Sequence, residues 1–332
     1  MHELAFPLLV GLIAIALAFD FLNGLHDAAN SIATVVSTRL LSPVWAVVFA
    51  AFGNFAAYWL VGLHVAETVG KGIIDKDAVT PAVVFGALVG AMFWNVVTWL
   101  KGIPSSSSHA LIGGLLGAGI AHGGFGVIES SGTTKTIIAI FLSPMLGFVL
   151  AMLMVLITSW LFKGFQPRRA EGVFKTLHLF SSAAYSISHG GNDAQKTMGI
   201  ITVLLYSTGQ LKGEFHIPEW VVISCYAAIA MGTMSGGWRI IKTMGTKLTK
   251  LNHHTGFSAS TAGSIVVFGA SAFGIPVSTT HAITGSVIGT GAARKASAVR
   301  WGVAGRVVTA WFITIPASAA VGAVFYVLTR MF

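Results

Sequence analysis

The chain has 332 residues, of which 55% are hydrophobic and 9% are charged. Soluble globular proteins carry about 25% charged residues. That contrast, with a mean hydropathy of +0.80, excludes a soluble enzyme and a disordered chain. The formal charge of +9 is better explained by Lys and Arg on the cytoplasmic loops of a membrane protein than by nucleic-acid binding. The lone cysteine, Cys225, excludes a disulfide framework and a thiolate zinc site.

The apolar segments are long enough to cross a bilayer, which takes about 20 residues of helix. Glu3 and no Lys or Arg precede the first segment, so we expect a retained first helix rather than a cleaved signal peptide. The sequence therefore predicts an all-α, multi-pass membrane protein. Its predicted helical runs are 6–38, 43–63, 81–100, 103–121, 135–161, 176–207, 219–238, 258–273, 275–293 and 307–329.

Charge is distributed unevenly over the connections between these runs. Lys and Arg outnumber acids in loops 162–175, 239–254 and 294–306, whereas acids match or outnumber them in loops 64–80 and 208–218. By the positive-inside rule the first three loops are cytoplasmic and the other two are external. Tracing the chain through these loops predicts that the N-terminus and the C-terminus both lie on the external side.

Two segments recur in the same order in the two halves of the chain. Residues 23–30 resemble 189–196 around a shared Asp, and residues 102–110 resemble 274–282 around Gly-Ile-Pro, hydroxyl residues and His-Ala. An odd number of crossings in each half inserts the second half upside down, which is typical of secondary transporters. We predict two inverted-topology repeats, each with a discontinuous helix and a re-entrant hairpin. The predicted first repeat, second repeat and short basic cytoplasmic linker are 1–165, 176–332 and 166–175.

The first repeated motif places an acid inside each of two apolar runs. A carboxylate in the bilayer core costs on the order of 3 kcal/mol, so Asp27 and Asp193 favour a functional site. Nearby glycines permit a break in each helix, and freed carbonyl oxygens together with carboxylates and amides suit a hard cation or a proton carrier. The alternative is that each Asp only pairs with a helix end or a nearby lysine. The cation-coupling candidates are Asp27, Asp193, Asn30, Asn192 and His26, with the two aspartates as metal ligands if the ion is sodium.

The second repeated motif predicts an anion site. Pro104 and Pro276 are expected in the first turn of a helix, and the hydroxyl residues after them add donors to a positive helix N-terminus. Hairpins entering from opposite faces can meet around one tetrahedral, phosphate-like anion. The alternatives are simple helix caps, or a serine nucleophile at Ser105 beside His109, which Val277 in the other copy disfavours. The anion-binding candidates are Ser105, Ser106, Ser107, Ser108, Ser278, Thr279, Thr280, Asn30 and Gln195.

The paired motifs resemble those of the inorganic phosphate transporter (Pit) family, and the resemblance covers about residues 18–325. It implies a cation-coupled phosphate symporter with an inverted repeat, and a dimer whose transport domain slides against a scaffold. His26 replaces the usual Asn of the first signature, and Gln195-Lys196 replaces Ala-Asn in the second. These changes resemble the bacterial low-affinity branch, which is typically driven by protons and takes phosphate with a divalent metal.

The resulting hypothesis is a transporter in the plasma membrane that imports inorganic phosphate by cation symport and alternating access. The proton is the favoured ion, because histidine titrates near neutrality and His26 adjoins Asp27, and sodium remains the alternative. A sulfate permease and an anion channel are the competing functions. We expect no enzyme activity, no resident cofactor and no nucleic-acid partner. The expected partners are phosphate, membrane lipid and a second copy of the chain.

Overall fold

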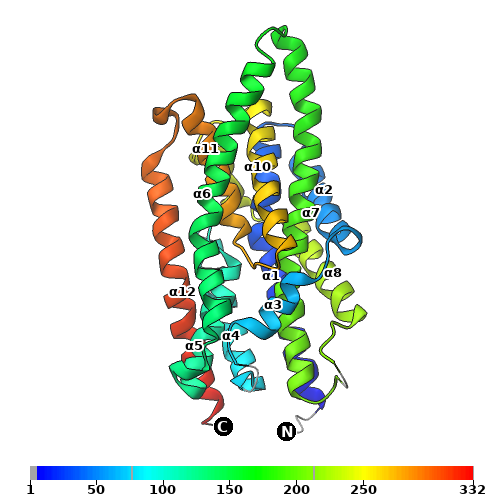
Figure 1. Cartoon of the computed structure of the whole chain (residues 1–332), viewed down its shortest axis with the longest axis vertical. Helices are drawn as coiled ribbons and strands as arrows, with labels where there is room; N and C mark the ends of the chain where they lie inside the picture. Colours follow the sequence, from blue (N-terminus) through cyan, green and yellow to red (C-terminus); the bar gives the residue numbers. More distant parts are fainter. Residues whose placement is uncertain (1–5, 76–77, 212–213, 332) are drawn as a thin grey trace.

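The computed structural model describes residues 6–75, 78–211 and 214–331, and within them the chain is almost entirely α-helical (Figure 1). Short 3-10 turns at Phe125–Val127 and Ala296–Ala298 join some of the helices. One π-helical turn lies at Thr243–Lys247. The helices are α1 (Phe6–Ser37), α2 (Pro43–Leu60), α3 (His64–Gly72), α4 (Pro81–Lys101), α5 (Ser107–Gly123), α6 (Ser130–Leu161), α7 (Pro167–Ser207), α8 (Glu219–Ser235), α9 (Trp238–Lys242), α10 (His253–Ala272), α11 (Thr279–Arg294) and α12 (Trp301–Thr329).

Helix ends follow the prolines and glycines of the sequence. Pro43, Pro81 and Pro167 lie in the first turn of a helix, where the missing N–H of proline has no intrahelical partner to lose. Gly102 and Gly274 adopt left-handed φ angles of 63° and 66° just after α4 and α10. Glycine takes this conformation without steric cost. The two Gly-Ile-Pro segments therefore end helices, as the sequence predicted.

The multi-pass, all-helical fold agrees with the prediction. Among the described residues, five helices are long and apolar enough to cross a membrane, namely α1, α2, α4, α6 and α12. A sixth span results if α8 and Trp238–Lys247 are taken as one helix with a 63° bend. The bend falls at Gly236-Gly237, inside a run that the sequence predicted as continuous.

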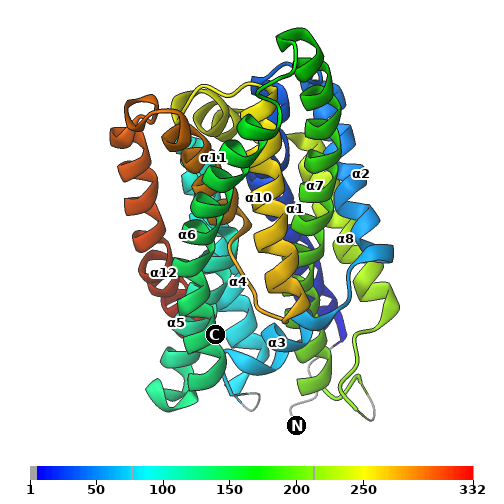
Figure 2. The same cartoon turned by 45° about the horizontal axis from the view of Figure 1, so that its top comes forward.

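The two halves repeat one order of helices (Figures 1 and 2). Each has a long helix, a second helix, a short helix, a pair of helices joined at Gly-Ile-Pro, and a final long helix. The pairs are α4 with α5 and α10 with α11. The second helix of each pair packs against the last helix of the other half, α5 on α12 and α11 on α6. The halves are thus interlocked rather than side by side.

The predicted discontinuous helices are wrong, because α1 and α7 run unbroken through the two Asp motifs. The glycines there allow close helix packing instead. A Cβ added to Gly24 would lie 2.2 Å from the carbonyl oxygen of Ile229 in α8. A Cβ on Gly190 would lie 2.5 Å from the backbone of Asn54 in α2. Small residues commonly serve this purpose between membrane helices.

Two further expectations differ from the structure. Pro104 and Pro276 lie before the first turns of α5 and α11, which begin only at Ser107 and Thr279, because a serine side chain caps each helix at the residue before. Four of the five predicted loops contain helix. Residues 64–72 form α3, and Pro167 starts α7 inside the predicted linker. Residues 239–247 belong to α9 and the π-helical turn, and α12 starts at Trp301 inside loop 294–306. Outside the described residues lie 1–5 and three charged residues of the predicted external loops, Lys76, Asp77 and Lys212.

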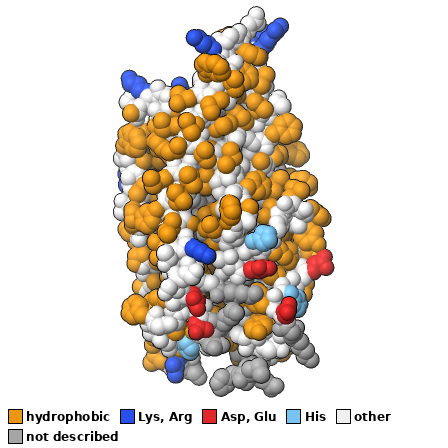
Figure 3. Space-filling model, in the orientation of Figure 1, with side chains coloured by type: hydrophobic (Ala, Val, Ile, Leu, Met, Phe, Trp, Pro, Cys, Tyr) orange, Lys and Arg blue, Asp and Glu red, His pale blue; other side chains and the backbone are white. Residues whose placement is uncertain are grey.

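Charged side chains mark the two ends of the bundle (Figure 3). Lys and Arg gather toward the end formed by the α6–α7 connection, and hydrophobic side chains cover the middle. On this face the Asp and Glu side chains lie toward the opposite end, where α1 begins and α12 ends (Figure 1). The positive-inside rule predicts this distribution for a protein whose α6–α7 connection faces the cytoplasm.

Candidate functional site

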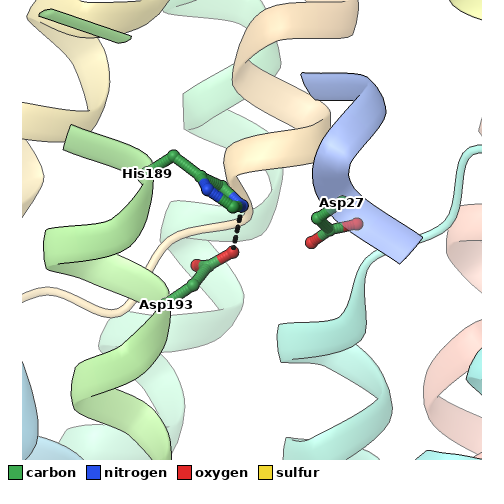
Figure 4. Close-up of side chains that lie close together, drawn as sticks. All are labelled: Asp27, His189 and Asp193. Atoms are coloured by element: carbon green, nitrogen blue, oxygen red, sulfur yellow. Dashed lines mark ion pairs between the residues drawn. The ribbon is translucent and has the colours of Figure 1, made fainter. Parts of the chain in front are cut away.

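The two repeated aspartates meet inside the bundle, where α1 packs beside α7 (Figure 4). One carboxylate oxygen of Asp27, one of Asp193 and a ring nitrogen of His189 lie within 4.8 Å of one another. All three side chains are buried. Because a buried carboxylate needs a compensating partner, the pair creates a place for positive charge where the two halves join.

Asp27 is held by side chains from both halves. Its Oδ2 accepts a hydrogen bond from Ser107 Oγ at 2.8 Å, and its Oδ1 accepts one from Thr280 Oγ1 at 3.2 Å. Ser107 Oγ also lies 2.6 Å from Asn23 Oδ1. Oδ1 of Asp27 is in addition 2.8 Å from Nδ1 of His26. The carboxylate therefore links α1 to the first turns of α5 and α11.

His26 can bind or release a proton while keeping its neighbours. Its Nε2 lies 3.0 Å from Thr98 Oγ1, which in turn donates to the carbonyl oxygen of Trp94 at 2.9 Å. In the neutral ring, Nδ1–H donates to Asp27 and Nε2 accepts from the Thr98 hydroxyl. In the charged ring, Nε2–H donates to Thr98 Oγ1, and the Thr98 hydroxyl then donates only to backbone carbonyl oxygens of α4. His26 therefore links Asp27 on α1 to Thr98 on α4 in either protonation state.

Asp193 has an equivalent but differently charged environment. Its Oδ2 accepts a hydrogen bond from Thr279 Oγ1 at 2.9 Å, as Asp27 does from Ser107. Nε2 of His189 lies 3.2 Å from the same oxygen. The ammonium of Lys196 is 2.5 Å from Oδ1. This half of the site is thus neutralised by the ammonium of Lys196.

Lys196 is the site residue that motif reasoning missed. Its Nζ donates to Asp193, to Ser108 Oγ at 2.5 Å and to the carbonyl oxygen of Val277 at 2.9 Å. These three oxygens surround the ammonium much as oxygen ligands surround a bound cation. The available signals were a lysine inside an otherwise apolar run and the alternative that an Asp pairs with a nearby lysine, and Asp193 does form that pair.

Asn30 and Lys196 hold equivalent positions, each three residues after its Asp. The amide of Asn30 donates to Thr280 Oγ1 at 2.8 Å, and the ammonium of Lys196 donates to Ser108 Oγ. Thr280 and Ser108 are themselves equivalent residues of the second motif. The site therefore repeats its geometry across the two halves while replacing one neutral amide by a positive charge.

The first turns of α5 and α11 bring the hydroxyl groups to this site. Ser106 and Ser278 accept hydrogen bonds from the backbone N–H of His109 and His281, both at 3.1 Å, so these two serines are helix caps. The capping alternative is correct for them alone. The next two residues of each helix face the charged groups instead, and they are Ser107, Ser108, Thr279 and Thr280.

The two helix starts are also in contact with each other. The rings of His109 and His281 lie with their centroids 4.3 Å apart and their planes at 88°. His281 also stacks on Trp311 of α12 at 3.8 Å. Neither imidazole has a hydrogen-bond partner among the described residues. Both histidines therefore act here as packing residues that hold two positive helix ends side by side.

Gln195, a predicted anion ligand, belongs to another part of the fold. Its side-chain oxygen accepts from the backbone N–H groups of Val65 and Ala66 at 3.0 and 3.2 Å, and its amide donates to the carbonyl oxygen of Gly62 at 2.7 Å. Gln195 thus provides a hydrogen-bond acceptor for the first N–H groups of α3, which have no intrahelical partner. The structure does not bring it together with the hydroxyl groups.

Asn192 and Ser105 also point away from the aspartates. The amide of Asn192 donates to Ser271 Oγ at 2.8 Å. The Ser105 hydroxyl lies 2.9 Å from Thr314 Oγ1 of α12 and accepts from Nε1 of Trp94 at 3.2 Å. The Ser105 side chain therefore joins the segment before α5 to α4 and α12, and makes no contact with His109 that would suit a nucleophile and its base.

The buried site has an unbalanced charge. With neutral imidazoles, the carboxylates of Asp27 and Asp193 outnumber the ammonium of Lys196 by one. An uncompensated buried charge is costly, so the site favours one more positive charge. A proton on His26 or Asp27 supplies it, and so does a monovalent cation near Asp27, Asp193 and His189.

Comparison with known proteins shows the family of the chain. The profile of a family described as the phosphate transporter family matches residues 23–322. The chain belongs to the phosphate transporter family. It is accordingly a multi-pass membrane transporter and not an enzyme, and the serine-nucleophile alternative is wrong. The predicted resemblance to the Pit family is confirmed.

Members of this family are similar to the chain over nearly its whole length. A probable low-affinity inorganic phosphate transporter of Rhizobium meliloti is 64% identical over 323 residues, covering 97% of both chains. The protein of the same description from Bacillus subtilis is 43% identical, covering 95% of both. A solved structure of a sodium-dependent phosphate transporter is 25% identical with a TM-score of 0.91, and the match covers 98% of this chain and 100% of that one.

Proposed function

We propose that the protein imports inorganic phosphate by symport with protons. One observation carries the proposal. Two helix N-termini bearing hydroxyl groups meet two buried aspartates, so that Ser107 contacts Asp27 and Thr279 contacts Asp193. An anion at the helix starts and a cation at the carboxylates then neutralise each other within one buried site. The family and the names of its members support phosphate as the anion.

Phosphate fits this site better than sulfate does. Dihydrogen phosphate carries two O–H groups that can donate to the carboxylates of Asp27 and Asp193, whereas sulfate at neutral pH carries none. Sulfate would therefore leave its oxygens facing carboxylates without a proton between them, and unpaired buried polar groups strongly disfavour such an analogue. The hydroxyl groups that we assign to phosphate are Ser107, Ser108, Thr279 and Thr280. Asn30, which donates to Thr280, completes the set.

The coupling proton is assigned to the Asp27–His26 pair. This half of the site has a titratable partner, whereas Asp193 is already paired with Lys196. Lys196 thus acts as a tethered cation that lowers the number of mobile cations needed. The Asp27, His189 and Asp193 group also offers two oxygens and a nitrogen to a metal ion. Hard cations such as sodium prefer all-oxygen ligands, so we favour the proton.

Transport by alternating access requires the site to face each side in turn. We propose that residues 1–165 and 176–332 form inverted repeats, joined at 166–175 on the cytoplasmic side, with the α4–α5 and α10–α11 hairpins entering from opposite faces. Rocking of one packed unit against the other then exposes the midplane site alternately. We further propose a homodimer in the plasma membrane. Both termini are placed on the external side, and the distribution of Lys and Arg supports this orientation.

The test is phosphate uptake into proteoliposomes under separately imposed proton and sodium gradients. We expect concentrative uptake with an inward proton gradient at constant sodium, and none with a sodium gradient at fixed pH. Uptake that follows only sodium contradicts proton coupling, and phosphate flux that only dissipates its own gradient indicates a channel. Preference for sulfate over phosphate in competition contradicts the assigned substrate.

A further inference from the structure

Asp20 is a buried acid that the site described above does not use. It lies on α1, seven residues before Asp27, which places both on one face of the helix about 10 Å apart. Asp20 is fully buried. Neither of its carboxylate oxygens has a donor at hydrogen-bonding distance and angle among the described residues. The second half of the chain has no acid at the equivalent position.

The surroundings of Asp20 are polar but contain no dedicated counter-ion. Its neighbours with titratable or polar groups are Asn23 on α1, Thr197 on α7 and Cys225 and Tyr226 on α8. The hydroxyl oxygens of Thr197 and Tyr226 also lack hydrogen-bond partners. The charged groups that act on Asp20 are Asp193 and Lys196 of α7.

Lys196 does not serve Asp20 as a partner, because its ammonium is already bonded to Asp193, Ser108 and Val277. An ionised carboxylate in these surroundings would carry an uncompensated charge in a buried place, which is the most costly arrangement for such a group. A carboxylic acid avoids that cost and can donate to a neighbouring oxygen. The side chain is therefore placed to hold a proton in this conformation.

Polar groups lead from Asp20 to the coupling site. Asn23 lies beside Asp20, and its Oδ1 is contacted at 2.6 Å by the Ser107 hydroxyl, which also contacts Asp27. These residues connect the outer part of α1, toward its N-terminal end, with the site where the two halves join. A proton entering from the end where α1 begins would meet Asp20 before Asp27 (Figure 1).

We propose that Asp20 is a second proton-carrying site of the transport cycle. Its carboxylate takes one proton from external water when the bundle opens on that side, travels as the neutral acid, and releases the same proton toward the cytoplasm after the site has changed sides. No bond other than O–H forms or breaks, and each cycle moves one proton more than the Asp27–His26 pair alone carries. This inference rests on the proposed proton-coupled import.

The test counts protons per phosphate in proteoliposomes, with a pH-sensitive dye and radiolabelled phosphate followed together. We expect Asp20→Asn to lower the ratio by one proton while phosphate counterflow at equal pH persists. Asp20→Glu should keep the wild-type ratio. As a matched control we choose Ser143→Ala on α6. Like Asp20, Ser143 is a buried polar side chain without a hydrogen-bond partner among the described residues, and its removal should leave the proton-to-phosphate ratio unchanged.

The outcomes separate this inference from the proposed function. If the wild type moves no protons with phosphate, both fail. If the wild type moves protons and Asp20→Asn moves as many, only the role of Asp20 is refuted. Should Asp20→Asn fail to fold, Asp20→Ser, which leaves space for a water molecule, provides the same count. A lowered ratio in both Asp20→Glu and Asp20→Asn would also contradict a proton-carrying role, because Glu retains the carboxyl group.

Discussion

Replacing Lys196 by Asn would give the second half of the site the residue that the first half has at Asn30. The substitution removes the ammonium that contacts Asp193 at 2.5 Å and leaves that carboxylate buried. Breaking a buried ion pair in this way costs about 3–5 kcal/mol. The new amide oxygen, with Asp193 and the Val277 carbonyl, can ligate a hard cation. We expect the variant to be destabilised and to recover with sodium.

The assay is thermal unfolding of the purified protein in detergent, with sodium chloride exchanged for choline chloride at constant ionic strength. An ion present at 100 times its Kd stabilises the folded state by about 2.7 kcal/mol, so sodium should restore much of the loss in Lys196→Asn. Phosphate uptake by this variant should become sodium-stimulated. The wild type should respond to sodium in neither measurement.

Lys196→Met is the matched control, because it removes the charge without adding an oxygen ligand. This variant should be destabilised to a similar extent and should not recover with sodium. Equal sodium responses of the Asn and Met variants would show that the ion binds elsewhere. Wild-type stability of Lys196→Asn in choline would refute the idea that the lysine is a tethered cation.

Three other expectations follow from the site and the fold. Ser107→Ala and Thr280→Ala should each weaken phosphate binding by about 1.5–3 kcal/mol, or roughly 10- to 150-fold, in calorimetric titration, because each loses a donor to a charged group; unchanged affinity in both would contradict the assigned cradle. Asp27→Asn should abolish proton-driven uptake but keep phosphate exchange, whereas a purely structural Asp27 predicts poor expression with normal coupling. A cysteine introduced at the exposed position Gln166 should react with an impermeant thiol reagent from the cytoplasmic side, and one at the exposed position Phe125 from the external side. The native Cys225 does not interfere because it is buried. Labelling of both positions from one side would overturn the topology.

Much of the fold could be predicted because membrane helices are specified by long apolar runs and by the residues that end them. The predicted run 81–100 corresponds to α4, and run 6–38 corresponds to α1. The reversal at Gly102 needs a left-handed residue, and glycine followed closely by proline indicates one. These features are local, so a single sequence is sufficient to reveal them.

The errors concern features that depend on neighbouring helices. Gly24 is compatible with a helix break and with close packing, and only the carbonyl oxygen of Ile229 against it decides for packing. Gln195 is polar and next to the site in sequence, yet on an α-helix one position turns the side chain by about 100°, toward α3. Lys196, one residue further, faces Asp193 one turn below it. Motif position alone does not distinguish these two directions.

The equivalent halves of the site differ in what their aspartates can exchange. Asp27 is paired with the imidazole of His26, whereas Asp193 is paired with the ammonium of Lys196. In the proposed cycle, one mobile proton on the first half makes the import of dihydrogen phosphate electrically neutral, so the membrane potential neither helps nor opposes it. A second proton on Asp20 makes each cycle carry one net positive charge inward. An inside-negative potential then contributes about 2.3 kcal/mol per 100 mV to accumulation. Asp20 thereby determines whether uptake draws on the membrane potential as well as on the pH gradient.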